Sequence, residues 1–197
     1  MEGLASNARR LAAALGTTAL VLAATGCGGG ARQDADEPSG QFEVVIAKAS
    51  FPARQRLAQP ERLVVAVENT GSRALPNVAV TVDSFSTRSE QPGLSDPDRA
   101  VWIVDDPPQN GTTANTTTWA LGRLEPGDIK RFEWRVTAVQ GGTHKVRWRV
   151  AAGLGGRAAA VLEGNRSPEG EFTVEISRRA PASRVVPTTG EVVRDGG

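Results

Sequence analysis

"KRFEWRVTAVQGGTHKVRWRVAA", residues 130–152, decides the fold class of this 197-residue chain, because both of its halves alternate between apolar and polar side chains. Successive side chains of a β-strand point to opposite faces, so this alternation predicts strands with one buried and one solvated face. The glycines of "QGGT" predict a hairpin turn between the halves. We expect Trp134 and Trp148 to lie close together in the core. The predicted buried positions are Phe132, Trp134, Val136 and Ala138, followed by Val146, Trp148 and Val150.

Further runs along the chain also have strand character, and turn signals rich in Gly, Pro and Asn separate them. These runs span 42–49, 62–69, 77–84, 100–105, 116–124, 158–164 and 171–177. Beyond residue 26, no stretch combines a helical apolar period with capping residues. The pattern predicts an all-β chain that forms an antiparallel, immunoglobulin-like β-sandwich of about seven to nine strands. A jelly roll or other sandwich and a mixed fold are the alternatives.

Two segments carry a family resemblance. "RLVVAVENTGSRALPNVAVTV" (62–82) and "LEPGDIKRFEWRVTAV" (124–139) resemble bacterial immunoglobulin-like surface modules of the cell-adhesion-related and conserved-repeat types. Within the first, Asn69-Thr70-Gly71 predicts a chain reversal, since Asn and Gly tolerate positive φ. The resemblance implies a noncatalytic surface or interaction module without a specified ligand. The loop 85–99 departs from a minimal module of this kind.

The single cysteine, Cys27, and the residues before it indicate where in the cell the protein lies. Arg9 and Arg10 precede an uncharged apolar run, 11–24, and small residues lead into the cysteine. These are the parts of a secretory signal peptide. The run is shorter than the roughly 20 residues that a spanning helix requires. An ordinary signal peptide with an incidental cysteine is the alternative to the assignment that follows.

The four residues Ala24-Thr25-Gly26-Cys27 resemble the bacterial lipobox, with Ala at position 24 in place of the commoner Leu. The resemblance implies cleavage between Gly26 and Cys27 and attachment of diacylglycerol to the Cys27 sulfur, with palmitate-type acyl chains. We therefore expect a lipoprotein anchored on the extracytoplasmic face of the cell membrane. Two or more acyl chains hold a protein durably.

These features predict four segments. They are a cleaved signal peptide (1–26), the lipidated cysteine with a flexible linker (27–40), the sandwich (41–178) and a disordered tail (179–197). Within the tail, "RVV" or "EVV" as an added edge strand is the alternative. The precursor has 23 basic and 22 acidic residues, and removal of Glu2, Arg9 and Arg10 leaves 21 of each. The neutral balance argues against nucleic acid as a partner.

Two charged groups are candidate binding sites. Asp96, Asp98, Asp105 and Asp106 lie in or beside a long loop and could offer carboxylates to calcium, although solvated turn residues are the alternative. Lys145, Arg147 and Arg149 form a basic row, with Arg131 and Arg135 expected on the next strand. That row would suit an anionic polymer or lipid headgroups. The alternative is cross-strand pairing with Glu133 or with Glu171 and Glu175.

Other chemistry is weakly represented. His144, the single histidine, opens a strand and has no nucleophile motif to serve. The chain lacks the Cys and His spacing of a metal site and any phosphate-binding glycine loop after a strand. We therefore expect no metal, no cofactor and no enzyme activity.

The functional prediction combines the anchor with the module. We expect a membrane-anchored binding, interaction or spacer module at the cell envelope, with an envelope protein or cell-wall component as partner. Loops 85–99 and 106–116, expected at one end of the sandwich, would make the contacts. An accessory lipoprotein of a transport or secretion complex is one alternative, and an enzyme with an unfamiliar site is another.

Overall fold

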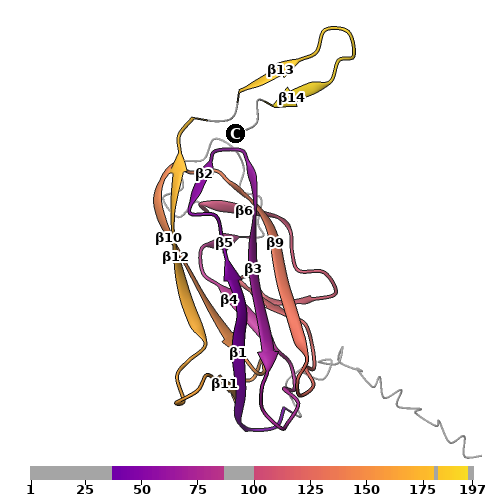
Figure 1. Cartoon of the computed structure of the whole chain (residues 1–197), viewed down its shortest axis with the longest axis vertical. Coiled ribbons are helices and arrows are strands. Elements are labelled where there is room, and N and C mark those ends of the chain that lie inside the picture. Colours follow the sequence, from indigo (N-terminus) through magenta and orange to yellow (C-terminus); the bar gives the residue numbers. More distant parts are fainter. Residues whose placement is uncertain (1–36, 87–99, 180–181, 195–197) are drawn as a thin grey trace, which may run out of the picture. The chain divides into compact units, whose positions relative to one another are not determined.

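The computed structural model describes residues 37–86, 100–179 and 182–194, and β-strands are the regular elements of these residues (Figure 1). Two sheets form a sandwich, so the predicted all-β fold is confirmed. Within the described residues, no helix has the length and hydropathy needed to cross a membrane.

The first sheet has the order β11-β1-β3-β9-β6-β5. Its strands are β1 (Gly40–Ser50), β3 (Pro60–Asn69), β5 (Phe85–Ser86), β6 (Trp102–Asp106), β9 (Ile129–Ala138) and β11 (Ala158–Val161). The second sheet has the order β2-β12-β10-β4-β8-β7. Its strands are β2 (Arg54–Arg56), β4 (Ala79–Val82), β7 (Thr112–Asn115), β8 (Thr118–Ala120), β10 (Gly142–Ala151) and β12 (Glu169–Ser177).

The strand order identifies the sandwich as immunoglobulin-like. In the immunoglobulin fold one sheet has the order A-B-E-D and the other G-F-C. Strands β1, β3, β9 and β6 take the first order, and β12, β10 and β4 take the second. The β7–β8 pair comes between the D and E positions in sequence and extends the second sheet beyond β4. The described sheets therefore hold more strands than the seven to nine expected.

Pairing at the sheet edges differs from the predicted antiparallel pattern. The edge strands β11, β2 and β5 pair in parallel with β1, β12 and β6. Pairings between the longer strands are antiparallel, including β1–β3, β3–β9 and β10–β12. A two-residue hairpin cannot join parallel neighbours, and several strands separate β11 from β1 and β12 from β2 in the sequence.

The expected hairpin at "QGGT" is wrong. Strand β9 pairs with β3 and β6, whereas β10 pairs with β12 and β4, so residues 139–141 carry the chain from one sheet to the other. A short glycine-containing segment can join strands of facing sheets as well as neighbours within one sheet. The predicted buried faces of the two strands are confirmed, because Phe132, Trp134, Val146 and Trp148 are all buried.

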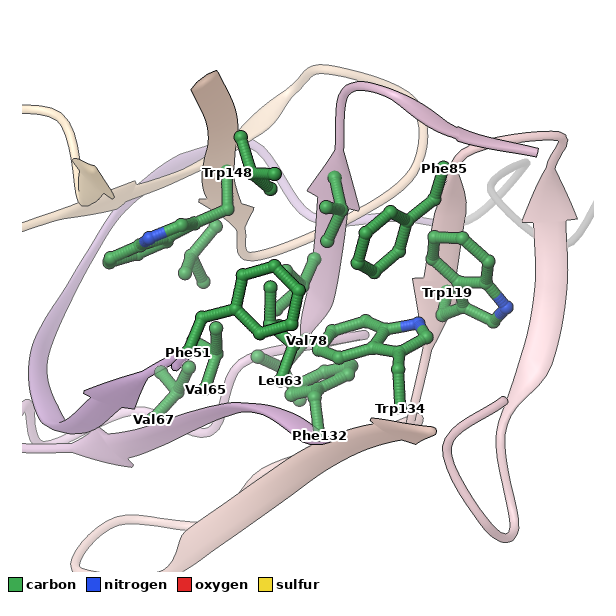
Figure 2. Close-up of a cluster of buried hydrophobic side chains, with 14 of the residues drawn as sticks. Phe51, Leu63, Val65, Val67, Val78, Phe85, Trp119, Phe132, Trp134 and Trp148 are labelled. Carbon is green, nitrogen blue, oxygen red and sulfur yellow. The ribbon is translucent and has the colours of Figure 1, made fainter. Parts of the chain in front are cut away.

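Aromatic side chains fill the space between the sheets (Figure 2). Trp134 of β9 packs edge-on against Trp119 of β8, with ring centroids 5.4 Å apart, and stacks on Phe132 at 5.9 Å. Phe51 lies against Trp102 at 5.6 Å. Trp148 contacts Phe172 at 6.4 Å, and no ring contact between Trp148 and Trp134 is found among the described residues. The expectation that these two tryptophans lie side by side therefore gains no support from ring geometry.

Asn69 has a different role from the one its "NTG" context predicts. Neither Asn69 nor Gly71 adopts a positive φ. The side chain is buried instead, and its Nδ2 donates to the carbonyl oxygens of Arg73 (2.9 Å) and Leu124 (3.0 Å). Its Oδ1 accepts from the Gly71 N–H at 3.0 Å. Asn69 thus joins the turn after β3 to the "LEPG" segment before β9.

The C-terminal segment contains a hairpin where the sequence predicted no regular structure apart from an added edge strand. Strands β13 (Ser183–Val185) and β14 (Val192–Arg194) pair with each other and with neither sheet among the described residues. The turn between them is closed by the Gly190 N–H, which donates to the Val186 carbonyl, and Gly190 has a φ of 69°. Glycine tolerates this φ, which accounts for the reversal.

We predict that Asn69→Ala lowers the free energy of unfolding by about 2–4 kcal/mol, because it leaves buried backbone groups without partners. Denaturant unfolding followed by tryptophan fluorescence measures the change. Thr113→Ala, at an exposed position of β7, is the control and should stay within about 0.5 kcal/mol of the wild type. A similar small effect for both variants would contradict the role assigned to Asn69.

Candidate functional site

The acidic candidates that the structure describes are engaged in separate contacts on β6. The Asp105 carboxylate accepts from the Thr137 hydroxyl at 2.7 Å, and Asp106 forms an ion pair with Arg135 at 2.7 Å. Asp96 and Asp98 lie outside the described residues. Within the described part of the chain, no group of three or more His, Cys, Asp or Glu side chains could hold a metal ion. The two described aspartates are thus held by neighbouring β9 side chains.

Each side chain of the basic row on β10 forms an ion pair with an acid beside it. Glu171 of β12 receives Lys145 at 2.7 Å and Arg147 at 2.9 Å, and Asp83 receives Arg149 at 3.4 Å. The hydrogen bond from Lys145, and then that from Arg147, hold the pKa of Glu171 below its usual value. The cross-strand pairing that we gave as the alternative to a binding face is therefore present for Lys145 and Arg147, through Glu171, whereas Arg149 pairs with Asp83, a partner that we did not predict.

The placement of Arg131 and Arg135 on the strand next to this row is wrong. Both belong to β9, in the other sheet. Glu133 on the same strand pairs with Arg131 at 2.8 Å and with Arg62 at 3.1 Å. The hydrogen bond from Arg131 is the main reason that the pKa of Glu133 lies below its usual value. Each sheet thus carries its own set of ion pairs on its outer face.

A polar hollow opens at the end of the sandwich where β2 lies, and sequence reasoning did not find it. Its volume is about 640 Å³, and Arg54, Arg56, Gln59, Glu61, Glu175 and Ser177 line it. Gln55 forms its inner wall, where the side-chain oxygen accepts from the Trp102 indole N–H at 2.8 Å. Burial raises the pKa of Glu61. The only sequence signal was the short alternation Arg-Gln-Arg, which is too brief to predict a strand.

The opposite end of β1 carries the contacts that begin the folded domain. Glu37 is buried, although the linker was expected to extend to residue 40, and its carboxylate accepts from the Gly155 N–H at 2.5 Å. Gly40 then pairs with Ala158 of β11. Glu37, in the segment predicted as linker, thus packs into the segment after β10. Gly26 and Cys27 lie outside the described residues.

The remaining candidates are placed as follows. His144 packs edge-on against Trp102 at 5.9 Å, and its Nε2 is buried without a hydrogen-bond partner. Part of the predicted loop 106–116 forms β7, whose side chains are exposed. Most of the loop 85–99 lies outside the described residues, which include only β5 at its start.

The fold and the contacts define the described chain as an immunoglobulin-like sandwich with charged outer faces. No known family model matches the sequence, and no curated protein matches it significantly. Among solved structures, it is similar to the CARDB domain of the PF1109 protein from Pyrococcus furiosus, solved in complex with di-metal ions. The TM-score is 0.41 at 15% identity, covering 71% of this chain and 93% of that one.

Two other solved structures are similar over comparable lengths. Native alpha-2-macroglobulin from Escherichia coli, from domain MG7 to the C-terminus, has a TM-score of 0.42 at 11% identity, over 76% of this chain and 21% of that one. The alkylpurine DNA glycosylase AlkC of Pseudomonas fluorescens has a TM-score of 0.37 at 14% identity, over 70% and 31%. At such scores and identities these likenesses carry no functional argument.

We predict that Glu171 titrates below 4.5, its ordinary value, because two cations bind the ionised form. Side-chain NMR against pH measures the midpoint. Lys145→Gln and Arg147→Gln should each raise it toward 4.5, whereas Arg62→Gln, on the other sheet, should leave it unchanged. A wild-type midpoint at or above 4.5 would contradict the pairing.

The lowered pKa of Glu171 also predicts how the stability of the fold depends on pH. The pKa of Glu171 is lower in the folded state, so the pairing stabilises the fold above pH 4.5 and is lost as pH falls through the folded pKa. The difference in melting temperature between wild type and Glu171→Gln should therefore disappear in acid.

Proposed function

We propose that the protein is a lipoprotein held on the outer face of the cell membrane by an acylated Cys27, and that its sandwich is a noncatalytic interaction or spacer module. One observation carries the proposal. The single cysteine of the chain follows an uncharged apolar run and two small residues, with two arginines upstream. Small residues at that position give a peptidase access to the backbone, and a thiolate is the nucleophile that lipid attachment requires.

The energetics favour a lasting anchor. Each buried methylene contributes about 0.8 kcal/mol, so one acyl chain binds a bilayer only marginally, whereas two or three bind it durably. Residues 28–36 separate Cys27 from Glu37, the first described residue of the domain. Ten Cα steps span at most about 36 Å. Glu37 would therefore lie within about 36 Å of the acylated cysteine.

The distribution of charge supports a noncatalytic role. Catalytic groups usually gather in a cleft where burial and close charges shift their pKa values. The carboxylates whose pKa values are lowered, Glu133 and Glu171, are each in surface ion pairs. Glu61, whose pKa burial raises, lines the hollow beside β2, but the residues that line this hollow include no histidine or cysteine to act with it. Such pairs fix strand neighbours and keep a surface soluble. An envelope protein or a cell-wall component would be the partner, reached without a cofactor.

The anchor is tested by Cys27→Ala in cells, followed by mass spectrometry and membrane fractionation. We expect the wild type to carry the added mass of the acyl groups and to sediment with membranes, and the variant to lose both properties. Gly26→Ala keeps a small residue beside the cysteine and should remain acylated, which makes it the matched control. A Cys27→Ala variant that still sediments with membranes, or a wild type with an unmodified thiol, would overturn the proposal.

A further inference from the structure

The outer face of the second sheet carries charge in alternating strands. Strand β10 is basic, with Lys145, Arg147 and Arg149 exposed, and β12 beside it is acidic, with exposed Glu169, Glu171 and Glu175. Strand β2 lies on the other side of β12 and is basic again. Its Arg54 and Arg56 are exposed on either side of the buried Gln55. Opposite charges on neighbouring strands attract across a sheet face. Among the described strands, the series ends on β2, which is the last strand in the order of this sheet.

The arginines of β2 differ from the other cations of the two outer faces. Most of those cations pair with a carboxylate, namely Arg62, Arg131, Arg135, Lys145, Arg147 and Arg149. Arg54 lies in register with Glu175, yet no ion pair joins them in the described part of the chain. Arg56 likewise has no carboxylate partner there. Both side chains therefore remain available to an acid that approaches from the open side.

The backbone of β2 is also open on that side. Ala53 accepts a hydrogen bond from the Glu175 N–H, and the Leu57 N–H donates to Ser177, so these odd-numbered positions face β12. Backbone groups alternate in direction along a strand, so the N–H groups of Arg54 and Arg56 face away from β12. The Arg54 carbonyl faces the same way. Unpaired groups at a sheet edge are a template for another strand.

The spacing of the two arginines matches that of an added strand. Residues two apart on a strand lie about 6.8 Å from each other on one face. Alternate side chains of an added extended segment have the same repeat, so acids at positions i and i+2 of that segment would meet Arg54 and Arg56. Arg54 and Arg56 also line the polar hollow of about 640 Å³, which they share with Glu61 and Glu175.

We propose that β2 is a docking edge for an extended segment of a partner protein that carries acidic side chains at alternate positions. The proposal specifies the partner of the interaction module, so it rests on the proposed function of the sandwich. The added strand would continue the basic, acidic, basic series with a second acidic strand. The proposed edge follows the Ser50 end of β1, and an eleven-residue strand spans about 36 Å. The docking edge therefore lies at the end of β1 opposite to the end from which the chain leads back to Cys27.

The proposal is tested with the full chain purified in detergent and a labelled peptide, Thr-Glu-Thr-Glu-Thr-Glu-Thr, at low salt. A peptide of the same composition with its glutamates adjacent, Glu-Glu-Glu-Thr-Thr-Thr-Thr, is the ligand control. We expect the alternating peptide to bind, and Arg54→Gln with Arg56→Gln to weaken it roughly tenfold or more. Lys48→Gln with Arg166→Gln removes the same charge at exposed positions elsewhere and should change binding less than about twofold.

Hydrogen exchange at the Arg54 and Arg56 amides separates strand addition from simple charge attraction. We expect both amides to exchange more slowly when the alternating peptide is bound. No binding by the wild type, equal binding of both peptides, equal losses in both double variants, or unchanged amide exchange would each overturn the proposal. The assay does not depend on acylation, so its failure is distinguishable from failure of the Cys27 test.

Discussion

Packing between the two sheets is the constraint on which the rest of the structure depends. Trp134 of β9 meets Trp119 of β8 across the interior and stacks on Phe132 of its own strand. The single cysteine lies outside the described domain, so no disulfide within the domain helps to hold the two sheets together. Burying large aromatic rings supplies the apolar area that a small domain needs, and their edge-to-face geometry fixes how the sheets meet. Any arrangement of the strands must keep these rings inside.

Buried polar groups complete the core at its two ends. Asn69 satisfies backbone groups of two separate segments, and Gln55 accepts from the Trp102 indole. A buried donor or acceptor without a partner is costly, so each of these amides limits where the neighbouring chain can run. Glu37 does the same for the start of the domain through Gly155. The charged outer faces then select strand neighbours through ion pairs such as those at Glu171 and Glu133.

Most of the fold could be predicted because alternation marks a buried face whatever the topology. The faces of β9 and β10 were recognised correctly from Phe132, Trp134, Val146 and Trp148. The same signal does not say which strand lies beside which, so "QGGT" was mistaken for a hairpin although it joins opposite sheets. Strands as short as β2 and β5 have too few residues to show a period. The β2 edge was missed for that reason, since its importance comes from its place beyond β12 rather than from its composition.

The pairing of β1 has a mechanical consequence for a tethered molecule. Strand β1 is bonded to β11 on one side in parallel and to β3 on the other in antiparallel fashion. A pull that enters at the N-terminal end runs along the axis of β1, so it loads the bonds to both neighbours in shear and together. Bonds loaded in this way resist as a group, whereas a peeled edge strand yields one bond at a time. Force applied at the N-terminal end of β1 would thus be resisted by these bonds as a group.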